Sequence, residues 1–381
     1  MSELADRIAA AFAAEEAAPQ PVTCAEEIPA RYECITSAWL TDVLCRDIPG
    51  AAVTAHRLDT PDDGANNRRR IFLTYNAAGE AAGLPPTVFC KAAQGLNNRL
   101  LMGHSGAILC EVTFFQRVRH HLSIETANAR HAAYDPKTFR SIVVLDDFAG
   151  YAEFCDETTV VDRAFAEAEV DLLADIHAPF YQSPLLETDL AALPTWHTRF
   201  SNLSHWRLEE SCAIGLREAG DIIPPALRAR ATEIWPATLS TLDRQKDLPA
   251  TLCHGDTHLK NWYVTTAGKI GLADWGATHR GHWSRDLVYT LTTSLTVEHR
   301  RLWERELFAR YIARMAAAGV VLDAEAGFVE YRRALLTALA FWTMTLKPAE
   351  GMPDMQPPAT SLVFIERLAA AVDDHDVLGL A

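Results

Sequence analysis

The chain has 381 residues, 49% of them apolar and 22% charged, which is typical of a soluble globular protein with one large domain or two lobes. Its net charge of -15 argues against a protein that binds nucleic acid or an anionic membrane surface. The eight cysteines form no C-x-x-C pair, the N-terminus is acidic rather than a signal peptide, and the longest mostly apolar stretch, 334–346, is too short for a membrane span. We therefore expect a cytoplasmic protein with free thiols.

The first 150 residues alternate helical and strand patterns. Thr36 or Ser37 is placed to cap one helix, and the acidic stretch 146–150 breaks a buried strand, so we expect a lobe boundary there. The expected lobes are 1–149 and 150–381. Helices are predicted over 2–17, 37–44 and 108–118, and strands over 52–58, 70–75, 85–91 and 141–145.

The rest of the chain is predicted to be mainly helical around one β-hairpin. Residues 262–264 and 269–273 read as two strands joined by the turn 265–268. The segment 183–250 reads as a helical insertion with scattered aromatic residues, Trp196, Phe200, Trp206 and Trp235. Further helices are predicted over 161–177, 287–295, 302–317, 328–346 and 361–372.

The stretch between the insertion and the hairpin carries the most specific chemical pattern. Asp256 lies five residues before Asn261, and Asp274 lies thirteen residues after Asn261. Phosphoryl transfer from ATP needs such a set: one carboxylate orients and deprotonates the attacking hydroxyl, while an amide oxygen and a second carboxylate hold Mg²⁺. Because the hairpin begins after Asn261 and ends before Asp274, both side chains can approach one metal ion.

The pattern His-Gly-Asp-x-His-x-x-Asn from His254 to Asn261, with the later Asp-Trp-Gly, resembles the aminoglycoside phosphotransferase and choline kinase superfamily of small-molecule kinases. The E-V-x-F-F helix and the R-D-L-x-Y-x-L-T-x-S stretch from Arg285 are most like its ecdysteroid-kinase-like branch. The resemblance spans roughly 50–370. It implies an α+β, two-lobed protein-kinase-like fold, with a small N-terminal lobe around an antiparallel sheet and a larger, mainly helical C-terminal lobe.

A lysine and a glutamate outside this pattern fit the same chemistry. Lys91 ends a predicted strand, and Glu111 follows twenty residues later in a predicted helix. Such a pair is the kinase device for gripping the α- and β-phosphates. The alternative is a snorkelling lysine and a surface glutamate, but beside the catalytic pattern the phosphate grip is favoured. Residues 97–99 are expected in a loop. The three arginines of residues 68–70 could contact phosphates, but a position at a solvated strand edge is favoured.

The resemblance also implies roles for the remaining candidates, with ATP and Mg²⁺ as cofactors. Leu145, Asp147 and Phe148 would lie where kinase backbone groups bind the adenine edge. Asp256 would be the general base, and His258 would orient the loop or touch the γ-phosphate.

The metal ligands would be Asn261 and Asp274. Asp286 would have a structural role and hold the catalytic loop in place. His177 is expected to be a packing or capping residue.

Two other classes of function compete with a kinase. The residues His254, His258, His279, His282, Asp256 and Asp274 could instead form the metal cluster of a hydrolase. That reading lacks the H-E-x-x-H pattern and leaves Lys91 and Glu111 without a role. An inactive kinase-like binding module is the third class. The partner of an active enzyme would be a small molecule with a hydroxyl group, and an aminoglycoside, a choline-like amine, a sugar and a lipophilic alcohol are all open.

Overall fold

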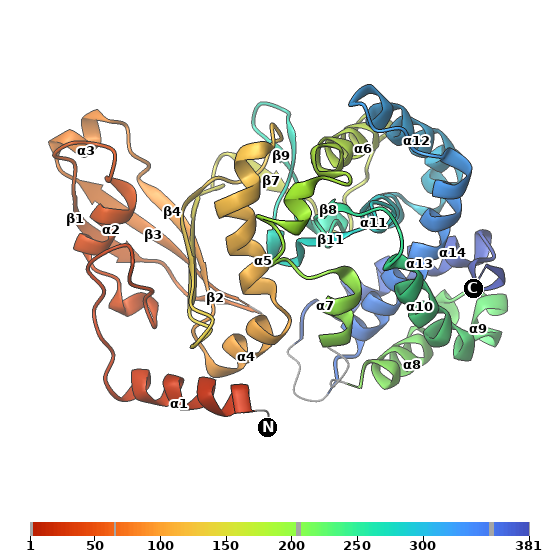
Figure 1. Cartoon of the computed structure of the whole chain (residues 1–381), viewed down its shortest axis with the longest axis horizontal. Coiled ribbons are helices and arrows are strands. Elements are labelled where there is room, and N and C mark those ends of the chain that lie inside the picture. Colours follow the sequence, from red (N-terminus) through yellow and green to blue (C-terminus); the bar gives the residue numbers. More distant parts are fainter. Residues whose placement is uncertain (1–2, 65, 203–206, 350–353, 381) are drawn as a thin grey trace. The chain divides into compact units, whose positions relative to one another are not determined.

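The computed structural model describes residues 3–64, 66–202, 207–349 and 354–380, so Trp206 lies outside the described residues. The chain divides into two compact units, whose elements are labelled in Figure 1. The N-terminal unit comprises Met1–Arg119 and Ala127–Tyr151, and the C-terminal unit comprises His120–Thr126 and Ala152–Ala381. The first unit is built on an antiparallel sheet and the second is mainly helical, which confirms the expected α+β, protein-kinase-like fold class.

The sheet of the N-terminal unit has the strand order β1-β3-β4-β6-β5, with β2 paired to β3. Its strands are β1 (Val53–Leu58), β2 (Asp62–Asp63), β3 (Asn67–Tyr75), β4 (Thr87–Ala92), β5 (Ala129–Tyr134) and β6 (Ser141–Asp146). The helices are α1 (Glu3–Ala17), α2 (Ser37–Leu44), α3 (Ala77–Ala81), α4 (Leu96–His104) and α5 (Ala107–Thr113). Thr36 caps α2 as predicted, since its side chain accepts a hydrogen bond from the N–H of Trp39.

Alternate residues of the central strands face two different layers, because side chains in a strand alternate between its faces. Cys90 of β4 and Val144 of β6 belong to the core under α2, whereas Val143 of β6 packs with Val112 of α5. Lys91 is the register partner of Val143. Because register partners point to the same face of a sheet, Lys91 projects from the face that packs with α5.

Two expectations for this unit are wrong. Residues 97–99 lie in the helix α4 rather than in a loop. The arginines of residues 68–70 lie inside β3, which is hydrogen-bonded to a strand on each side and is not an edge. They are tolerated there because carboxylates neutralise them: Arg68 pairs with Asp62, and Arg69 pairs with Asp63.

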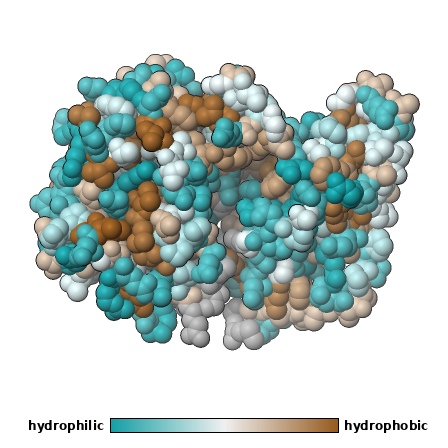
Figure 2. Space-filling view, turned by 180° about the vertical axis from the view of Figure 1, so that it is seen from behind, coloured by the Kyte–Doolittle hydropathy of each residue, from teal (hydrophilic) through white to brown (hydrophobic). Residues whose placement is uncertain are grey.

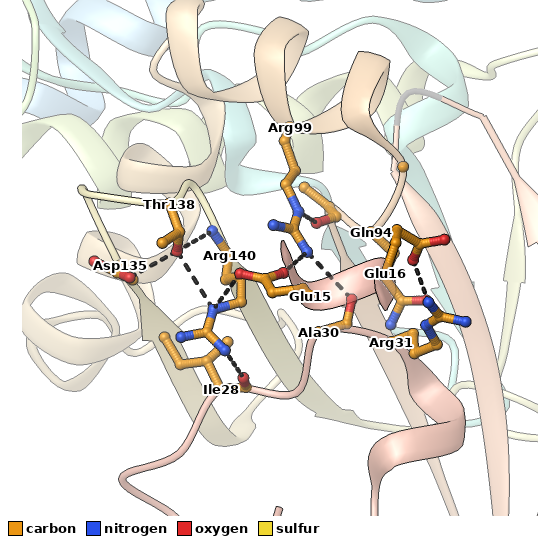
Figure 3. A network of polar contacts seen from close by, with 12 residues as sticks. Glu15, Glu16, Ile28, Ala30, Arg31, Gln94, Arg99, Asp135, Thr138 and Arg140 are labelled. Atoms are coloured by element: carbon orange, nitrogen blue, oxygen red, sulfur yellow. Dashed lines mark hydrogen bonds and ion pairs between the residues drawn. The ribbon is translucent and has the colours of Figure 1, made fainter. Parts of the chain in front are cut away.

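The helix α1 is tied to α4 by a buried arginine. Arg99 is 1% exposed, forms an ion pair with Glu15 of α1 at 2.6 Å, and donates to the carbonyl oxygens of Ala93 (3.3 Å) and Ala30 (3.4 Å) (Figure 3). Arg140 lies 3.5 Å from the same Glu15 carboxylate. Two residues of α1, Ala5 and Ile8, are buried, so these charged contacts anchor the helix together with a small apolar contact.

The C-terminal unit contains two small sheets among its helices. One has the order β10-β9-β7, and the other pairs β8 with β11. The strands are β7 (Ala152–Phe154), β8 (Thr251–Cys253), β9 (Trp262–Thr265), β10 (Ile270–Leu272) and β11 (His279–Gly281). The helices are α6 (Arg163–His177), α7 (Trp196–Asn202), α8 (Leu208–Ala219), α9 (Pro225–Ala229), α10 (Ala231–Gln245), α11 (Ser284–Ser294), α12 (Val297–Ala317), α13 (Ala324–Leu346) and α14 (Pro358–Asp374).

The predicted hairpin is present, and one helix lies at the centre of this unit. β9 and β10 pair in antiparallel register, with Trp262 opposite Leu272. All eleven residues of α11 are buried, so this helix is surrounded by the rest of the unit. α12 begins five residues earlier than predicted, because the Thr296 side chain caps it by accepting the N–H of His299.

The surface carries apolar side chains in several separate groups. Figure 2 shows them distributed over both parts of one face, between hydrophilic residues. Such scattered exposure is normal for globular proteins and does not indicate a docking surface. Of the helices that the structure describes, none combines the length and hydropathy needed to cross a bilayer.

Candidate active site

The backbone of the catalytic loop is held by one carboxylate. Asp286 of α11 accepts the N–H of His254 at 2.6 Å and the N–H of Gly255 at 2.9 Å. Gly255 has φ +85°, and a Cβ there would meet Ala277 O at 2.4 Å, so the position requires glycine. Burial raises the pKa of Asp286, but its hydrogen bond to His177 and the charges of nearby histidines lower that pKa to about 2. The carboxylate therefore stays ionised and keeps both loop amides bound.

His254 links the loop to the strand that leads to Asp274. Its Nε2 lies 3.0 Å from Ala273 O, and its Nδ1 accepts the N–H of Asp256 at 3.2 Å. Burial lowers the pKa of His254, so the ring is neutral and carries its proton on Nε2. His254 consequently fixes the backbone of Asp256 relative to Ala273.

The Asp256 carboxylate meets three polar groups. Tyr289 donates its hydroxyl to Oδ1 at 3.4 Å, Asn261 donates Nδ2 to Oδ2 at 3.3 Å, and His258 Nε2 lies 3.5 Å from Oδ2. Burial raises the pKa of Asp256, but His258, His254 and Arg285 outweigh it and hold the pKa below its ordinary value. Since 40% of the side chain is exposed, an ionised oxygen is open to a molecule that approaches the loop.

The hairpin links the backbone of Asn261 to the residue before Asp274. Asn261 ends the turn Leu259–Asn261, donates Nδ2 to Asp256 O at 2.7 Å, and accepts the N–H of Ala273 on its backbone oxygen at 2.9 Å. Asp274 directly follows Ala273, whose N–H is hydrogen-bonded to Asn261 O. The backbone of Asp274 adopts φ +67°. Positive φ is uncommon for a non-glycine residue, although aspartate adopts it more often than most. An amide oxygen and a carboxylate are hard oxygen donors, which fit Mg²⁺.

The N-terminal unit joins the lysine and the glutamate that the sequence singled out. Lys91 Nζ lies 3.0 Å from Glu111 Oε1, and the two side chains are 12% and 5% exposed. Lys91 projects from β4, and Glu111 lies on α5, which covers that face of the sheet. The alternative of a snorkelling lysine and a surface glutamate is wrong, because both side chains are largely buried and paired.

The three candidates for the adenine edge lie at the end of β6. Leu145 is buried within the strand, and Phe148 stacks on Tyr151 with ring centroids 6.0 Å apart. The Asp147 carboxylate accepts Arg70 Nε at 2.5 Å. Burial raises the pKa of Asp147, but hydrogen bonds from Arg70, Ala149 and Thr87 together with the charge of Arg70 outweigh it, and the net pKa is lowered. The Asp147 side chain is thus engaged within its own unit.

The metal cluster of the hydrolase alternative is not assembled. Across the described ranges, the one group of three His, Cys, Asp or Glu residues with ligand atoms within 4.8 Å of one another is His177, Cys253 and Asp286. None of the residues suggested for the hydrolase cluster belongs to it. Asp286 already uses both carboxylate oxygens on the loop backbone, so this group serves as a buried hydrogen-bond network.

Sequence reasoning missed several residues that shape the site. His177, expected to pack or cap, sits between Tyr311 Oη (2.8 Å) and Asp286 Oδ2 (3.3 Å) and so orients the carboxylate that holds the loop. Tyr289 was not singled out. The signal that could have found it is its spacing, three residues after Asp286, which puts both side chains on one face of a helix.

Comparisons with known proteins point to one family. Residues 112–328 match the model of the phosphotransferase enzyme family. No curated protein matches the chain. The three similar structures named next share only 13–14% of their sequence with this chain and have TM-scores below 0.5, so their substrates are not assigned to it. Solved structures similar to the chain include the GDP complex of wild-type aminoglycoside 2'-phosphotransferase-IIIa (14% identity, covering 81% of this chain and 89% of that chain, TM-score 0.46), macrolide 2'-phosphotransferase type I (14%, 81% and 92%, 0.45) and choline kinase LicA from Streptococcus pneumoniae (13%, 84% and 94%, 0.46).

Proposed function

Because this chain belongs to the phosphotransferase enzyme family, we propose that it transfers the γ-phosphate of ATP, with Mg²⁺, to a hydroxyl group of a small molecule. One observation carries the proposal. The exposed Asp256 carboxylate and the Asn261 amide share one loop, and the Asn261 backbone is bonded to the residue before Asp274. A base and two metal ligands are thereby linked by three hydrogen bonds in one rigid segment.

Each residue of this segment has a proposed task. Asp256 accepts the proton of the attacking hydroxyl and aims that oxygen at the γ-phosphate. His258 faces the same carboxylate at 3.5 Å and orients it. The Asn261 amide oxygen and the Asp274 carboxylate would hold Mg²⁺, which neutralises phosphate charge when bound. His254 keeps the loop backbone in place.

The N-terminal unit has the nucleotide-binding role in this proposal, and the C-terminal unit has the catalytic and acceptor-binding role. Lys91, held by Glu111 at 3.0 Å, would grip the α- and β-phosphates. The backbone over Leu145, Asp147 and Phe148 would meet the adenine edge. We place the chain in the ecdysteroid-kinase-like branch, on its R-D-L-x-Y-x-L-T-x-S stretch, and we assign it to the cytoplasm.

An ATP-consumption screen tests the proposed function. The purified chain is incubated with ATP, Mg²⁺ and panels of aminoglycosides, choline-like amines, sugars and lipophilic alcohols, and phosphorylated product is identified by mass spectrometry. We expect one class to give product, and Asp274→Asn to give none because the phosphates lose a metal ligand. ATP binding without transfer to any class would favour an inactive binding module. Stoichiometric zinc that survives dialysis would favour the hydrolase.

A further inference from the structure

The helix α11 contacts the catalytic loop through three residues of one face. Asp286 holds the loop backbone. One turn later Tyr289 donates its hydroxyl to Asp256 Oδ1 at 3.4 Å, and Thr290 donates to the carbonyl oxygen of Thr257 at 3.2 Å. Residues spaced by three and four lie side by side on a helix. The helix that fixes the loop backbone therefore also reaches the side chain of the proposed base.

Tyr289 is suited to donate a hydrogen bond. Its side chain is buried, and burial together with the nearby Asp256 charge raises its pKa well above the ordinary value. The hydroxyl consequently keeps its proton and faces the carboxylate as a donor. Asn261 donates to the other oxygen of that carboxylate at 3.3 Å, and His258 Nε2 lies 3.5 Å from that same oxygen, so Tyr289 is the partner that holds Oδ1.

The ring of Tyr289 is itself held by a buried cation. The Arg285 guanidinium carbon lies 4.0 Å from the centroid of the Tyr289 ring and 4.8 Å from that of Trp196, and the arginine is 1% exposed. Within the described part of the chain, its Nε and Nη1 atoms have no hydrogen-bond acceptor. The guanidinium thus lies over two aromatic rings, as in a cation–π contact, which is strongest when desolvated.

We propose that Tyr289 is a positioning residue for phosphoryl transfer, which orients the Asp256 carboxylate, and that Arg285 holds the tyrosine ring for this task. The expected effect on kcat rests on the proposed function, whereas the orientation of the Asp256 carboxylate by Tyr289 does not. A base must present a lone pair along the line of attack, and a displacement of about 1 Å can cost a factor of about 100 in rate. Because Tyr289 meets Oδ1 while Asn261 and His258 meet Oδ2, the carboxylate cannot rotate without losing a hydrogen bond.

Tyr289→Phe tests the proposal with little change in volume. It removes the hydroxyl but keeps the ring under Arg285. We expect kcat to fall about 10- to 100-fold, with KM for ATP unchanged, because only the orientation of the base is affected. Tyr331→Phe is the matched control, since Tyr331 is also buried and donates to a carboxylate, Glu304 Oε1, at 2.9 Å. This control should retain the wild-type kcat. An unchanged kcat in Tyr289→Phe overturns the proposal.

A second measurement separates this inference from the proposed function. High-resolution crystal structures of the wild type, Tyr289→Phe and Tyr331→Phe report the orientation of the Asp256 carboxylate without any acceptor. We expect a rotated or split carboxylate in Tyr289→Phe only. If the wild type transfers phosphate to no acceptor, the proposed function fails, and the carboxylate orientation still decides the role of Tyr289. A carboxylate that is identical in all three structures overturns the positioning role even in an active enzyme.

Discussion

At the scale of single residues, Asp256 offers the sharpest test of the chemistry. Asp256→Asn keeps the shape of the side chain and one of its two acceptor oxygens but cannot take a proton. We expect kcat to fall by roughly 10²–10⁴, about 3–5 kcal/mol of barrier, with the fold and the ATP affinity preserved. Single-turnover transfer and calorimetry measure the two quantities. Asp243→Asn, at an exposed position on α10, is the control. Transfer within a few-fold of wild type would remove Asp256 as the base, and lost ATP binding would recast it as a metal or structural ligand.

A second single-residue substitution, at Lys91, tests whether this lysine binds the phosphates of ATP. Lys91→Met keeps the apolar stem but removes the ammonium that would meet the phosphates. We expect ATP to bind about 10- to 100-fold more weakly, since a charge-assisted hydrogen bond contributes about 1.5–3 kcal/mol. Isothermal titration measures the affinity, with the exposed Lys246→Met as the control. Unaltered ATP affinity together with a large drop in melting temperature would show that Lys91 serves packing.

At the scale of elements, the contact between α1 and α4 tests how the N-terminal helix is anchored. Glu15 and Glu16 are neighbours, yet Glu15 pairs with the buried Arg99, whereas Glu16 pairs with the more exposed Arg31 (Figure 3). Removing one partner of a buried pair leaves an uncompensated charge, so Glu15→Gln should lower the free energy of unfolding by about 3 kcal/mol. Glu16→Gln should cost about 1 kcal/mol or less, as surface pairs do.

Urea unfolding of the two variants measures both changes. If Glu15→Gln and Glu16→Gln lowered the free energy of unfolding equally, the burial of Arg99 would not decide how strongly it binds Glu15. A loss for Glu15→Gln confined to α1, seen as hydrogen exchange in that helix alone, would show that α1 opens without the rest of its unit.

At the scale of the whole molecule, buried histidines make the folded chain sensitive to acid. Burial lowers the pKa of His279 to about 4 and that of His282 to about 3, whereas histidine in an unfolded chain titrates near about 6.5. As the pH falls below that value, the unfolded chain takes up protons that the folded chain does not bind. The free energy of unfolding should therefore decrease by about 1.4 kcal/mol per pH unit for each histidine.

Urea unfolding at about pH 7.5 and about pH 5.5 measures how the free energy of unfolding depends on pH. The free energy at each pH follows from the urea concentration at the midpoint and the slope of the transition. His282→Asn should weaken it, because an amide does not titrate but its oxygen can replace the ring nitrogen Nδ1 that meets Ser284. His120→Asn, at an exposed position, should leave the dependence unchanged. A free energy of unfolding that stays constant across this range would contradict the prediction.

Local features of the chain were determined by the sequence itself. The spacing of Asp256 and Asn261, the hairpin that leads to Asp274, and the Thr36 cap each depend on residues close together in the chain, so pattern and turn chemistry suffice to predict them. The roles of these residues in catalysis stay predictions until they are tested.

Only the tertiary structure showed that residues distant in the sequence meet. The Lys91–Glu111 pair, 20 residues apart, and the role of Asp286, 32 residues from His254, were predicted from the kinase resemblance, whereas the contact of Tyr289 with Asp256, 33 residues away, was not. Sequence patterns report which face of an element is apolar, but the packing of whole elements sets which polar groups on those faces come within hydrogen-bonding distance. The burial of Arg99 in α4 escaped prediction for this reason: a buried arginine needs a counter-charge, and its partner, Glu15, lies far away in the sequence.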